Sequence, residues 1–493
     1  MLTPVDVSFE SLHIETLIPM LIAIVGGLVI LVADLAKKDL DKSLYVMLAV
    51  TFLLLDLGSL FQTDINQRGF FDVLLVDGLA MLGQFIVLIG SLAFVMLSFS
   101  RKNFHEYLYA EYFAFYMFMV AGLQFMIATD NLILIFVGLE TSSLALYTMI
   151  AMHNRHTALE ASIKYFTMGA LSAGLYAFGA MILYALSGSV EIGKIAEVLS
   201  ASGYEPMILV IVATAFMIGA FGFKMALVPF HTWVPDVYEG STAALAGFMS
   251  IVPKIAALVV IMRLFEFLLN SEILWVEVMI YALVVLTMTL GNIWALVQDD
   301  VKRMLAYSSI SHAGFVMAAV LIGTTHANSA LFVYWLLFLF TNLGAFAMLW
   351  ASRTKDNSAR YDHTFEKFSG LIKTSPIAAF MIAIFMLSLA GVPPFSLFFG
   401  KMYMISSAVT GGYITLAIIM ALNSAIAAYY YLKIIFFMFF REPLVNDGSE
   451  VMANAGNSVR SVIGIAALFT IFGIFLVNPI MEMVTYFVYT SGY

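Results

Sequence analysis

Four charged residues interrupt long apolar stretches of the chain: Glu140 in FVGLETSSLALY, Lys224 in GAFGFKMALVPFH, Lys254 in SIVPKIAALVV and Lys401 in FSLFFGKMYMIS. A charge at the centre of a bilayer costs roughly 2.5–3.5 kcal/mol on insertion scales, so such residues are rare and usually functional. A structural ion pair between Glu140 and Lys224 is the simplest alternative. One deep acid cannot neutralise three deep lysines, however, and together the four residues predict a proton path.

The chemistry of such a path follows from the effect of burial on an amine. Burial disfavours the charged form, and a nearby carboxylate favours it again. Lys224 beside Glu140 is therefore a candidate electrostatic switch, in which displacement of the carboxylate releases the lysine proton. Lys254 would accept that proton and Lys401 would pass it to the exit. Water has to bridge these groups, because the helix positions are too far apart for direct transfer.

Three further polar residues are candidates for the same route. Lys164 in LEASIKYF lies about two turns inside a span, where snorkelling to the cytoplasm explains it equally well. His312 follows Ser308 by four residues, so both side chains share one helix face and favour a hydrated seam. His231 and Asp236 flank a span end in PFHTWVPDVYEG, where they line the path or only brace a loop.

Other charges in or near the spans have simpler interpretations. Arg263, close to Glu266, and Lys433 lie near span ends and are expected to snorkel to the nearest membrane surface. Asp34 lies at a boundary and is expected to be solvated. Asp56 lies deeper, and the sequence suggests no partner for it.

The composition explains why these charges are exceptional. Of the 493 residues, 62% are hydrophobic and 11% are charged, and the mean hydropathy is +0.98. A soluble domain is close to half apolar and a quarter charged, so this chain has too little polar surface for a soluble particle. We predict an all-α polytopic membrane protein that forms a single transmembrane domain over residues 1–493. Membrane strands would instead show a regular alternation of apolar and polar residues.

A membrane-spanning helix takes about 20 apolar residues, and the chain contains fourteen segments of that kind. They cover residues 16–36, 44–61, 78–99, 108–128, 131–151, 158–186, 206–229, 242–267, 274–297, 301–322, 329–352, 373–407, 413–440 and 460–489. The expected fold is therefore a bundle of about 14 transmembrane helices.

Two of these segments are interrupted by residues that break helices. The interruptions are Gly219, Gly222 and Pro229 in the seventh segment and Gly391, Pro393, Pro394 and Gly400 in the twelfth. Interrupted segments at matching places point to inverted repeats around a midplane ion site, and ordinary proline kinks are the alternative. We predict three N-terminal helices in 1–107, repeats of five helices in 108–267 (helices 4–8) and 274–440 (helices 9–13), and a last helix in 460–489.

The distribution of lysine and arginine supports this map. One set of loops carries fifteen of them: Lys37, Lys38, Lys42, Arg101, Lys102, Arg155, Lys302, Arg303, Arg353, Lys355, Arg360, Lys367, Lys373, Arg441 and Arg460. The opposite loops carry only Arg68 and Lys194. Because cytoplasmic loops are enriched in these residues, both termini are expected to face the outside.

Composition also excludes several functions. The chain has no cysteine, which excludes disulfides and cysteine-held iron–sulfur clusters. Its net charge of −9 offers no basic patch for nucleic acid. No metal site and no cofactor site are predicted.

Five stretches resemble signatures of the antiporter-like subunits of respiratory complex I, the proton-translocating NADH–quinone oxidoreductase. They are GLETSSLALY, LEASIKY, GFKMALVPFHTWVPDVYEGS, DDVKRMLAYSSISHAGF and LSLAGVPPFSLFFGKMY. Their order and spacing match over nearly the whole chain. The DVYEG ending and the fourteen-span length are typical of one branch, whereas a longer branch has an extra lateral helix and another typically has glutamate where Lys401 stands.

The resemblance implies roles by position. Glu140 is similar to the acid paired with the lysine of the seventh helix, Lys224 to that lysine, Lys254 to the central lysine of the eighth helix and Lys401 to the exit-side lysine of the twelfth. Lys164, His231 and His312 fall at polar-axis positions of the family.

The resemblance further implies a translocase subunit of the inner (plasma) membrane that moves protons while quinone is reduced elsewhere. FMN, iron–sulfur clusters and quinone would belong to partner subunits. The expected partners are membrane subunits of the M, K and J types, lipid, protons and water. An Mrp-type cation/proton antiporter subunit and a non-transporting scaffold remain as alternatives; the DVYEG loop and Lys401 favour the complex I subunit over the antiporter.

Overall fold

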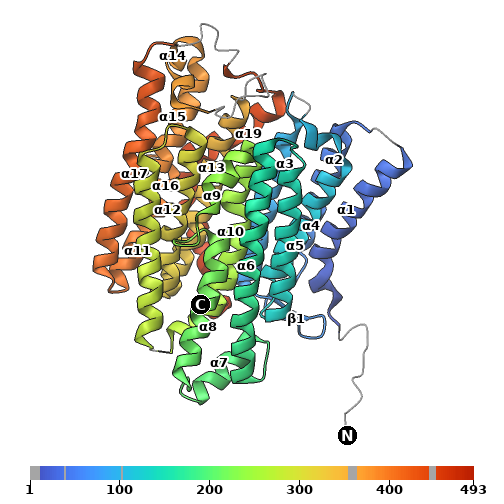
Figure 1. Cartoon of the computed structure of the whole chain (residues 1–493), viewed down its shortest axis with the longest axis vertical. Coiled ribbons are helices and arrows are strands. Elements are labelled where there is room, and N and C mark those ends of the chain that lie inside the picture. The colour runs from blue at the N-terminus through green and yellow to red at the C-terminus, as the bar shows by residue number, and fades with distance from the viewer. Residues whose placement is uncertain (1–11, 38–39, 102–103, 272, 353–362, 444–450) are drawn as a thin grey trace.

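The computed structural model describes residues 12–37, 40–101, 104–271, 273–352, 363–443 and 451–493. Helices run side by side along the long axis of the molecule (Figure 1). Within the described part, thirteen stretches are long and apolar enough to cross a membrane. The predicted all-α membrane fold is therefore confirmed. Five of the basic loop residues named above lie outside the described residues: Lys38, Lys102, Arg353, Lys355 and Arg360.

The N-terminal helices match the first three predicted spans. The elements are η1 (Ile14–Leu17), α1 (Ile18–Ala36), α2 (Lys42–Leu60), α3 (Gly78–Val95) and η2 (Met96–Phe99). A short antiparallel hairpin, β1 (Gln67–Gly69) with β2 (Leu74–Val76), joins α2 to α3 and was not predicted. Its strands are only three residues long, too short for a periodic sequence signal.

The next part of the chain contains the predicted helices 4–8. The elements are η3 (His105–Leu108), α4 (Ala110–Ile127), α5 (Leu132–Ala151), α6 (His156–Ser187), α7 (Ile192–Ala201), α8 (Met207–Met225), α9 (Trp233–Gly240) and α10 (Ala243–Leu269). Helix α7 lies between the sixth and seventh predicted spans, where no helix was predicted. It forms because Ile192, Ile195 and Leu199 recur at helical spacing and are buried.

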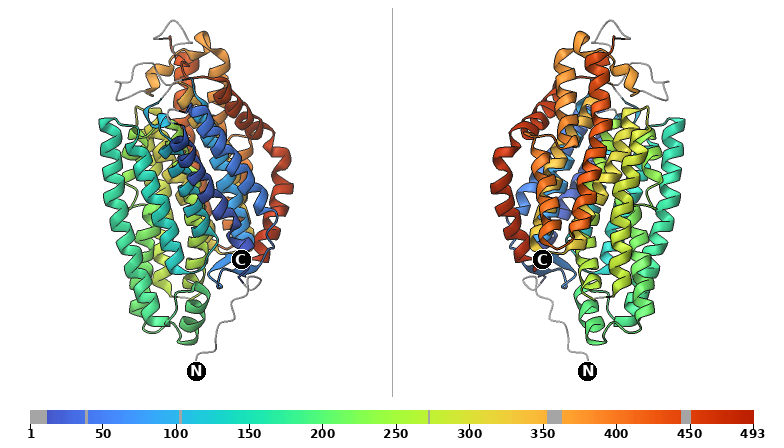
Figure 2. Two further views of the ribbon diagram at one scale, coloured as in Figure 1. Left: turned by 90° about the vertical axis from the view of Figure 1, so that its right-hand side faces the viewer. Right: turned by 90° about the vertical axis from the view of Figure 1, so that its left-hand side faces the viewer.

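The last part contains the predicted helices 9–14. The elements are α11 (Leu274–Leu296), α12 (Val301–Ile322), α13 (Thr325–Ala351), η4 (Phe365–Phe368), α14 (Leu371–Thr374), α15 (Pro376–Ala390), α16 (Ser396–Thr410), α17 (Ile414–Phe440), α19 (Asn457–Phe472), η5 (Gly473–Leu476) and α20 (Val477–Thr490). Helices α19 and α20 lie on the opposite flank of the bundle from α6 and α7 (Figure 2).

Both predicted interruptions are present. The seventh segment stops at Met225, where Ala226 has a φ of 63°, and resumes as α9. The twelfth is divided into α15 and α16 around Gly391, which has a φ of 83°, and two prolines. Proline cannot donate a backbone hydrogen bond and Gly391 adopts a positive φ without strain, which explains the second break. In the seventh segment Gly219 and Gly222 lie inside α8, and the helix ends instead at Ala226, three residues before Pro229.

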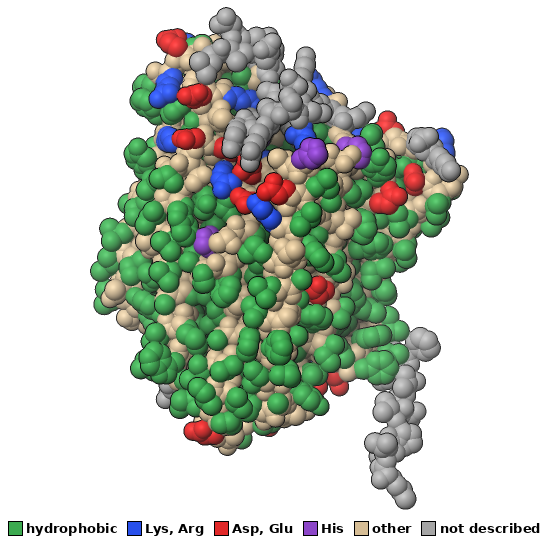
Figure 3. Space-filling view, in the orientation of Figure 1, with side chains coloured by type: hydrophobic (Ala, Val, Ile, Leu, Met, Phe, Trp, Pro, Cys, Tyr) green, Lys and Arg blue, Asp and Glu red, His purple; other side chains and the backbone are tan. Residues whose placement is uncertain are grey.

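Burial divides the helices into a core and a lipid-facing shell. The most apolar 18-residue window of α10 is 100% buried and that of α13 is 89% buried, whereas the value for α6 is 28%. A broad hydrophobic surface covers the middle of the molecule, and lysine and arginine gather at its upper end (Figure 3). This arrangement suits a bundle whose outer helices face lipid and whose central helices are shielded from it.

Helices α4 and α5 approach each other closely through glycine. A Cβ added to Gly138 on α5 would lie 2.6 Å from the carbonyl oxygen of Gly122 on α4. Only glycine fits such a contact without moving a helix, and the contact places the turn of α5 that carries Glu140.

We therefore expect Gly138→Leu to destabilise the protein. Overpacking typically costs about 1–3 kcal/mol, and here the obstacle is backbone. The measurement is the thermal unfolding midpoint of the detergent-purified chain. Gly174→Leu is the matched control, since a Cβ at Gly174 on α6 meets nothing within 4 Å. Equal midpoints for the two variants would contradict the role of the glycine contact.

Candidate functional site

Lys224 lies in the last turn of α8 and points at α5. Its side chain is buried, and its ammonium group donates to Ser143 Oγ at 2.8 Å and to Ser142 Oγ at 3.4 Å. Glu140 lies two to three residues before these serines on the same helix, and its Oε1 has no hydrogen-bond partner among the described residues. The predicted neighbours thus lie near each other, but the described residues contain no ion pair between them within 4.0 Å.

Lys254 lies in the centre of α10, directly after Pro253. It is 1% exposed and donates to the carbonyl oxygen of Ser309 on α12 at 2.9 Å and to Ser309 Oγ at 3.4 Å. Both partners are neutral. The ammonium group is therefore held by hydrogen bonds that do not fix its charge.

A row of polar side chains continues from this point along α12. Ser308, next to Ser309, forms a hydrogen bond with the hydroxyl of Tyr431 on α17. That hydroxyl also lies 3.0 Å from His312 Nε2, and His312 Nδ1 contacts the hydroxyl of Tyr334 on α13. The shared face predicted for Ser308 and His312 is confirmed, because Tyr431 contacts both.

Lys401 lies in α16 just after the second interruption. Its ammonium group donates to the carbonyl oxygens of Leu389 at 2.8 Å and Ala390 at 3.2 Å. These carbonyls end α15, and the interruption of the helix leaves them without intrahelical partners. A small cavity of about 10 Å³, close to the size that holds one water molecule, is lined by both His312 and Lys401.

The structure therefore joins some of the predicted residues and separates others. Lys254, His312 and Lys401 lie along one polar row with Ser309, Ser308, Tyr431 and the small cavity, but among the described residues no hydrogen bond joins Ser309 to Ser308. Glu140 and Lys224 form a second group on α5 and α8. Among the described residues, no chain of hydrogen bonds links the two groups, and none of the three lysines has a carboxylate within 4.0 Å.

Lys164 belongs to a network at the Lys- and Arg-rich end. It forms ion pairs at 2.8 Å with Glu160 and with Asp236 on α9, and Arg303 on α12 contacts the other oxygen of Asp236 at 3.1 Å. The network lines an open polar cavity of about 630 Å³. Burial raises the pKa of Asp236, but the hydrogen bonds from Lys164 and Arg303 outweigh it and leave the pKa below its usual value.

His231 lies apart from both groups, in the segment between α8 and α9. Its ring stacks on Trp294 with the centroids 4.7 Å apart. The side chain is buried, and Nδ1 has no hydrogen-bond partner among the described residues. The structure thus places His231 in an aromatic contact rather than in the polar row.

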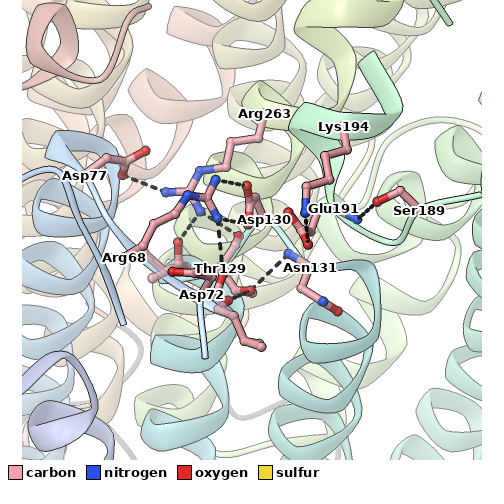
Figure 4. Close-up of polar contacts among 12 residues, drawn as sticks. Arg68, Asp72, Asp77, Thr129, Asp130, Asn131, Ser189, Glu191, Lys194 and Arg263 are labelled. Atoms are coloured by element: carbon pink, nitrogen blue, oxygen red, sulfur yellow. Dashed lines mark hydrogen bonds and ion pairs between the residues drawn. The ribbon is translucent and has the colours of Figure 1, made fainter. Parts of the chain in front are cut away.

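The prediction that Arg263 snorkels to the membrane surface is wrong. Arg263 is 3% exposed and donates to Asp77 Oδ1 and to the carbonyl oxygens of Ile127 and Thr129, at 2.6–2.7 Å (Figure 4). Other helices enclose α10 and leave its side chains no route to the surface. Asp77, which caps α3, supplies the counter-charge to Arg263.

Three further charged residues that the sequence placed in or near the spans have identifiable partners. Lys433 is 24% exposed and donates to the carbonyl oxygen of Gln298, as expected near a helix end. Asp34 accepts a hydrogen bond from Tyr45. Asp56 does have a partner, Gln124 on α4, at 2.9 Å.

Several residues of the site were not predicted. They are Ser142, Ser143, Ser309, Tyr334 and Tyr431. The serines follow Glu140 or precede His312 in the sequence, so their position beside a candidate residue could have identified them. The tyrosines lie on other helices, and neither their number nor their spacing pointed to His312.

Comparison with known proteins identifies the family. The family described as NADH:quinone oxidoreductase/Mrp antiporter, TM, matches residues 129–427. A relative from Sulfurimonas denitrificans named NADH-quinone oxidoreductase subunit N is 61% identical, and the match covers 100% of both chains. A second from Sulfurovum sp. with the same name is 54% identical over 100% of both. The chain belongs to the NADH-quinone oxidoreductase subunit N family.

Solved structures agree with this membership. A chain of respiratory complex I from Thermus thermophilus has a TM-score of 0.79 and 28% identity, with 94% of this chain and 98% of that chain covered. A chain of the Mrp complex from Dietzia sp. has a TM-score of 0.81, but its 21% identity shows the fold alone. Subunit N is a membrane-arm subunit of a proton-translocating enzyme complex, so the predicted translocase class is confirmed and the Mrp alternative is not favoured.

Because Arg263 is buried in an ion pair, its replacement should destabilise the protein. Removing one partner of a buried ion pair leaves an unpaired charge and costs roughly 3–5 kcal/mol. Arg263→Ala should therefore lower the thermal midpoint of the purified protein strongly. Lys373→Ala is the comparison, because both partners of the Lys373–Glu442 pair are exposed, at 53% and 83%. An equal or larger loss in Lys373→Ala would contradict the assignment.

Proposed function

We propose that this chain moves protons along a path formed by Glu140, Lys224, Lys254, His312 and Lys401, coupled to quinone reduction in partner subunits. The main observation is that, within the part of the chain that the structure describes, these three buried lysines have no carboxylate within 4.0 Å and are held instead by serine hydroxyls and backbone carbonyls. A permanent salt bridge would fix the ammonium charge. Neutral partners leave each lysine able to lose and regain its proton.

The first step involves Lys224 and Glu140. Glu140 has an unpartnered oxygen near the lysine, so a small displacement of this carboxylate changes the electrostatic support for the ammonium group. When the carboxylate moves away, burial favours release of the proton from Lys224. No hydrogen bond leads onward from Lys224 to Lys254 among the described residues, so this transfer requires water.

The second step uses groups that both accept and donate. Hydroxyl and imidazole groups can take a proton on one side and release one on the other. Ser308, Tyr431 and His312 meet this condition and are hydrogen-bonded in sequence, whereas the step from Lys254 and Ser309 to Ser308 requires water. The small cavity beside His312 gives one water molecule room to complete the connection to Lys401.

The polar cavity at the Lys- and Arg-rich end is the proposed cytoplasmic mouth. Asp236 holds α9 to α6 through Lys164 and to α12 through Arg303, so Lys164 positions the mouth. His231 remains a proposed member of the path on the strength of its unpartnered Nδ1. The two interrupted helices support inverted repeats over 108–267 and 274–440, after 1–107 and before 460–489.

We place the chain in the inner (plasma) membrane with both termini outside. Neighbours of the M, K and J types follow from membership of the complex, and FMN, iron–sulfur clusters and quinone reside in partner subunits. Among the described residues, no group of three or more His, Cys, Asp or Glu side chains is arranged to hold a metal.

Replacing Lys254 tests the path directly. Lys254→Ala in the assembled enzyme should reduce or abolish proton uptake per quinone reduced, relative to the wild type. The measurement is proton uptake by vesicles, with assembly verified. Lys433→Ala, which removes a part-exposed lysine at the inner end of α17, should pump normally. Unchanged pumping in Lys254→Ala would leave only the scaffold interpretation, and sodium transport would favour the antiporter.

The orientation can be tested because the chain has no cysteine. Lys194→Cys and Lys373→Cys place single thiols at lysines that are 63% and 53% exposed on opposite ends. We expect a membrane-impermeant maleimide to label only Lys194→Cys in intact cells. Permeabilised cells should label both, which controls for access. Selective labelling of Lys373→Cys would reverse the orientation.

A further inference from the structure

Asp56 is a buried carboxyl group that the proton row does not use. It lies in α2, fourteen residues from the start of that helix, and is 0% exposed. Its Oδ1 accepts a hydrogen bond from Gln124 Nε2 on α4 at 2.9 Å, and Gln124 is also 0% exposed. Two oxygens, Asp56 Oδ2 and Gln124 Oε1, have no partner among the described residues.

An ionised carboxylate does not fit this environment. A buried charge requires an opposite charge or several donors, and Asp56 has a single amide donor. The elements packed closely against α2 are α1, α3, α4 and η2. The charged residues of these elements are Asp34 on α1 and Glu111 on α4, which would repel rather than stabilise a negative charge.

These two acids also lie far from Asp56. Asp34 accepts from Tyr45, which precedes Asp56 by eleven residues or roughly 16 Å along α2. Glu111 precedes Gln124 by thirteen residues, roughly 20 Å along α4. Tyr112 and Tyr116 lie between them on α4 and are neutral. The Asp56–Gln124 contact is therefore isolated from every described charge on the neighbouring helices.

A single proton on Asp56 gives both unpartnered oxygens a hydrogen-bond partner. If Asp56 Oδ2 carries a proton, it becomes a donor, and the oxygen free to accept on the facing amide is Gln124 Oε1. The acid and the amide then form two hydrogen bonds in a closed ring, with one donor and one acceptor on each side. We propose that Asp56 is a permanent proton-binding site, in which the neutral carboxyl and the Gln124 amide join α2 to α4.

This site is distinct from the proton path. Asp56 has no hydrogen bond to any member of the lysine row among the described residues, and its proton has no relay to leave by. Its ligand is a proton that stays bound, so the pair acts as a neutral polar contact between α2, one of the N-terminal three helices, and α4. Replacing the acid by its amide should preserve the contact, because asparagine also offers one donor and one acceptor.

Infrared spectroscopy of the purified complex tests the proposal. The wild-type minus Asp56→Asn difference spectrum should show the C=O band of a protonated carboxyl, shifted when the aspartate carboxyls are labelled with a heavier carbon isotope. The band should persist from mildly acidic to mildly alkaline buffer. Bands of an ionised carboxylate in its place would overturn the proposal, as would a band that disappears when sodium is added, because that result would indicate a bound cation.

Matched variants give a second readout that does not depend on the spectrum. Asp56→Asn should assemble, pump protons and unfold at the wild-type midpoint over the same buffers. Asp56→Leu and Gln124→Leu should each lower the midpoint, because each strands the polar groups of the other residue. An Asp56→Asn variant as unstable as Asp56→Leu would show that the negative charge is required and would overturn the proposal.

Discussion

The structure depends on one constraint: a buried ammonium group within the membrane needs hydrogen-bond acceptors, and the acceptors that the three buried lysines contact carry no negative charge. Within an intact helix each carbonyl already accepts a backbone hydrogen bond, so only a second lone pair remains for a side chain. The interruption between α15 and α16 frees the carbonyls of Leu389 and Ala390, and Lys401 donates to both. Lys254 instead donates to the carbonyl and the hydroxyl of Ser309 within the continuous helix α12. The broken helix and the neighbouring serine thus make a buried, uncommitted lysine possible.

Buried charges of two kinds coexist on α10, and the difference lies in their side-chain chemistry. Arginine stays protonated in proteins, so Arg263 is held by an aspartate and two carbonyls and stabilises the packing of α10 against α3 and the α4–α5 turn. Lysine can lose its proton when it is desolvated. Lys254, nine residues earlier on the same helix, has only neutral partners among the described residues. One helix therefore carries a fixed charge near its C-terminal end and a changeable one at its centre.

Helix α12 connects the parts of the site. Its first turn carries Arg303, which holds α9 through Asp236, and its middle carries Ser309 and His312, which contact Lys254 and Tyr431. The polar mouth and the buried row are thus attached to one rigid element. A displacement of α9 at the mouth would act on the helix that supports the row, which provides a physical link between the two.

The sequence by itself determined the features that depend on short segments of the chain. Apolar runs predicted the spans, glycine and proline predicted the breaks near Lys224 and Lys401, and charges within apolar runs predicted the candidate residues. Only the tertiary structure determined which side chains become hydrogen-bond partners. Tyr431 meets His312 across 119 residues and Asp77 meets Arg263 across 186, and the same packing showed that Arg263 does not snorkel. The physical reason is that hydropathy and helix breaking are properties of short segments, whereas a hydrogen-bond partner depends on which helix faces come together.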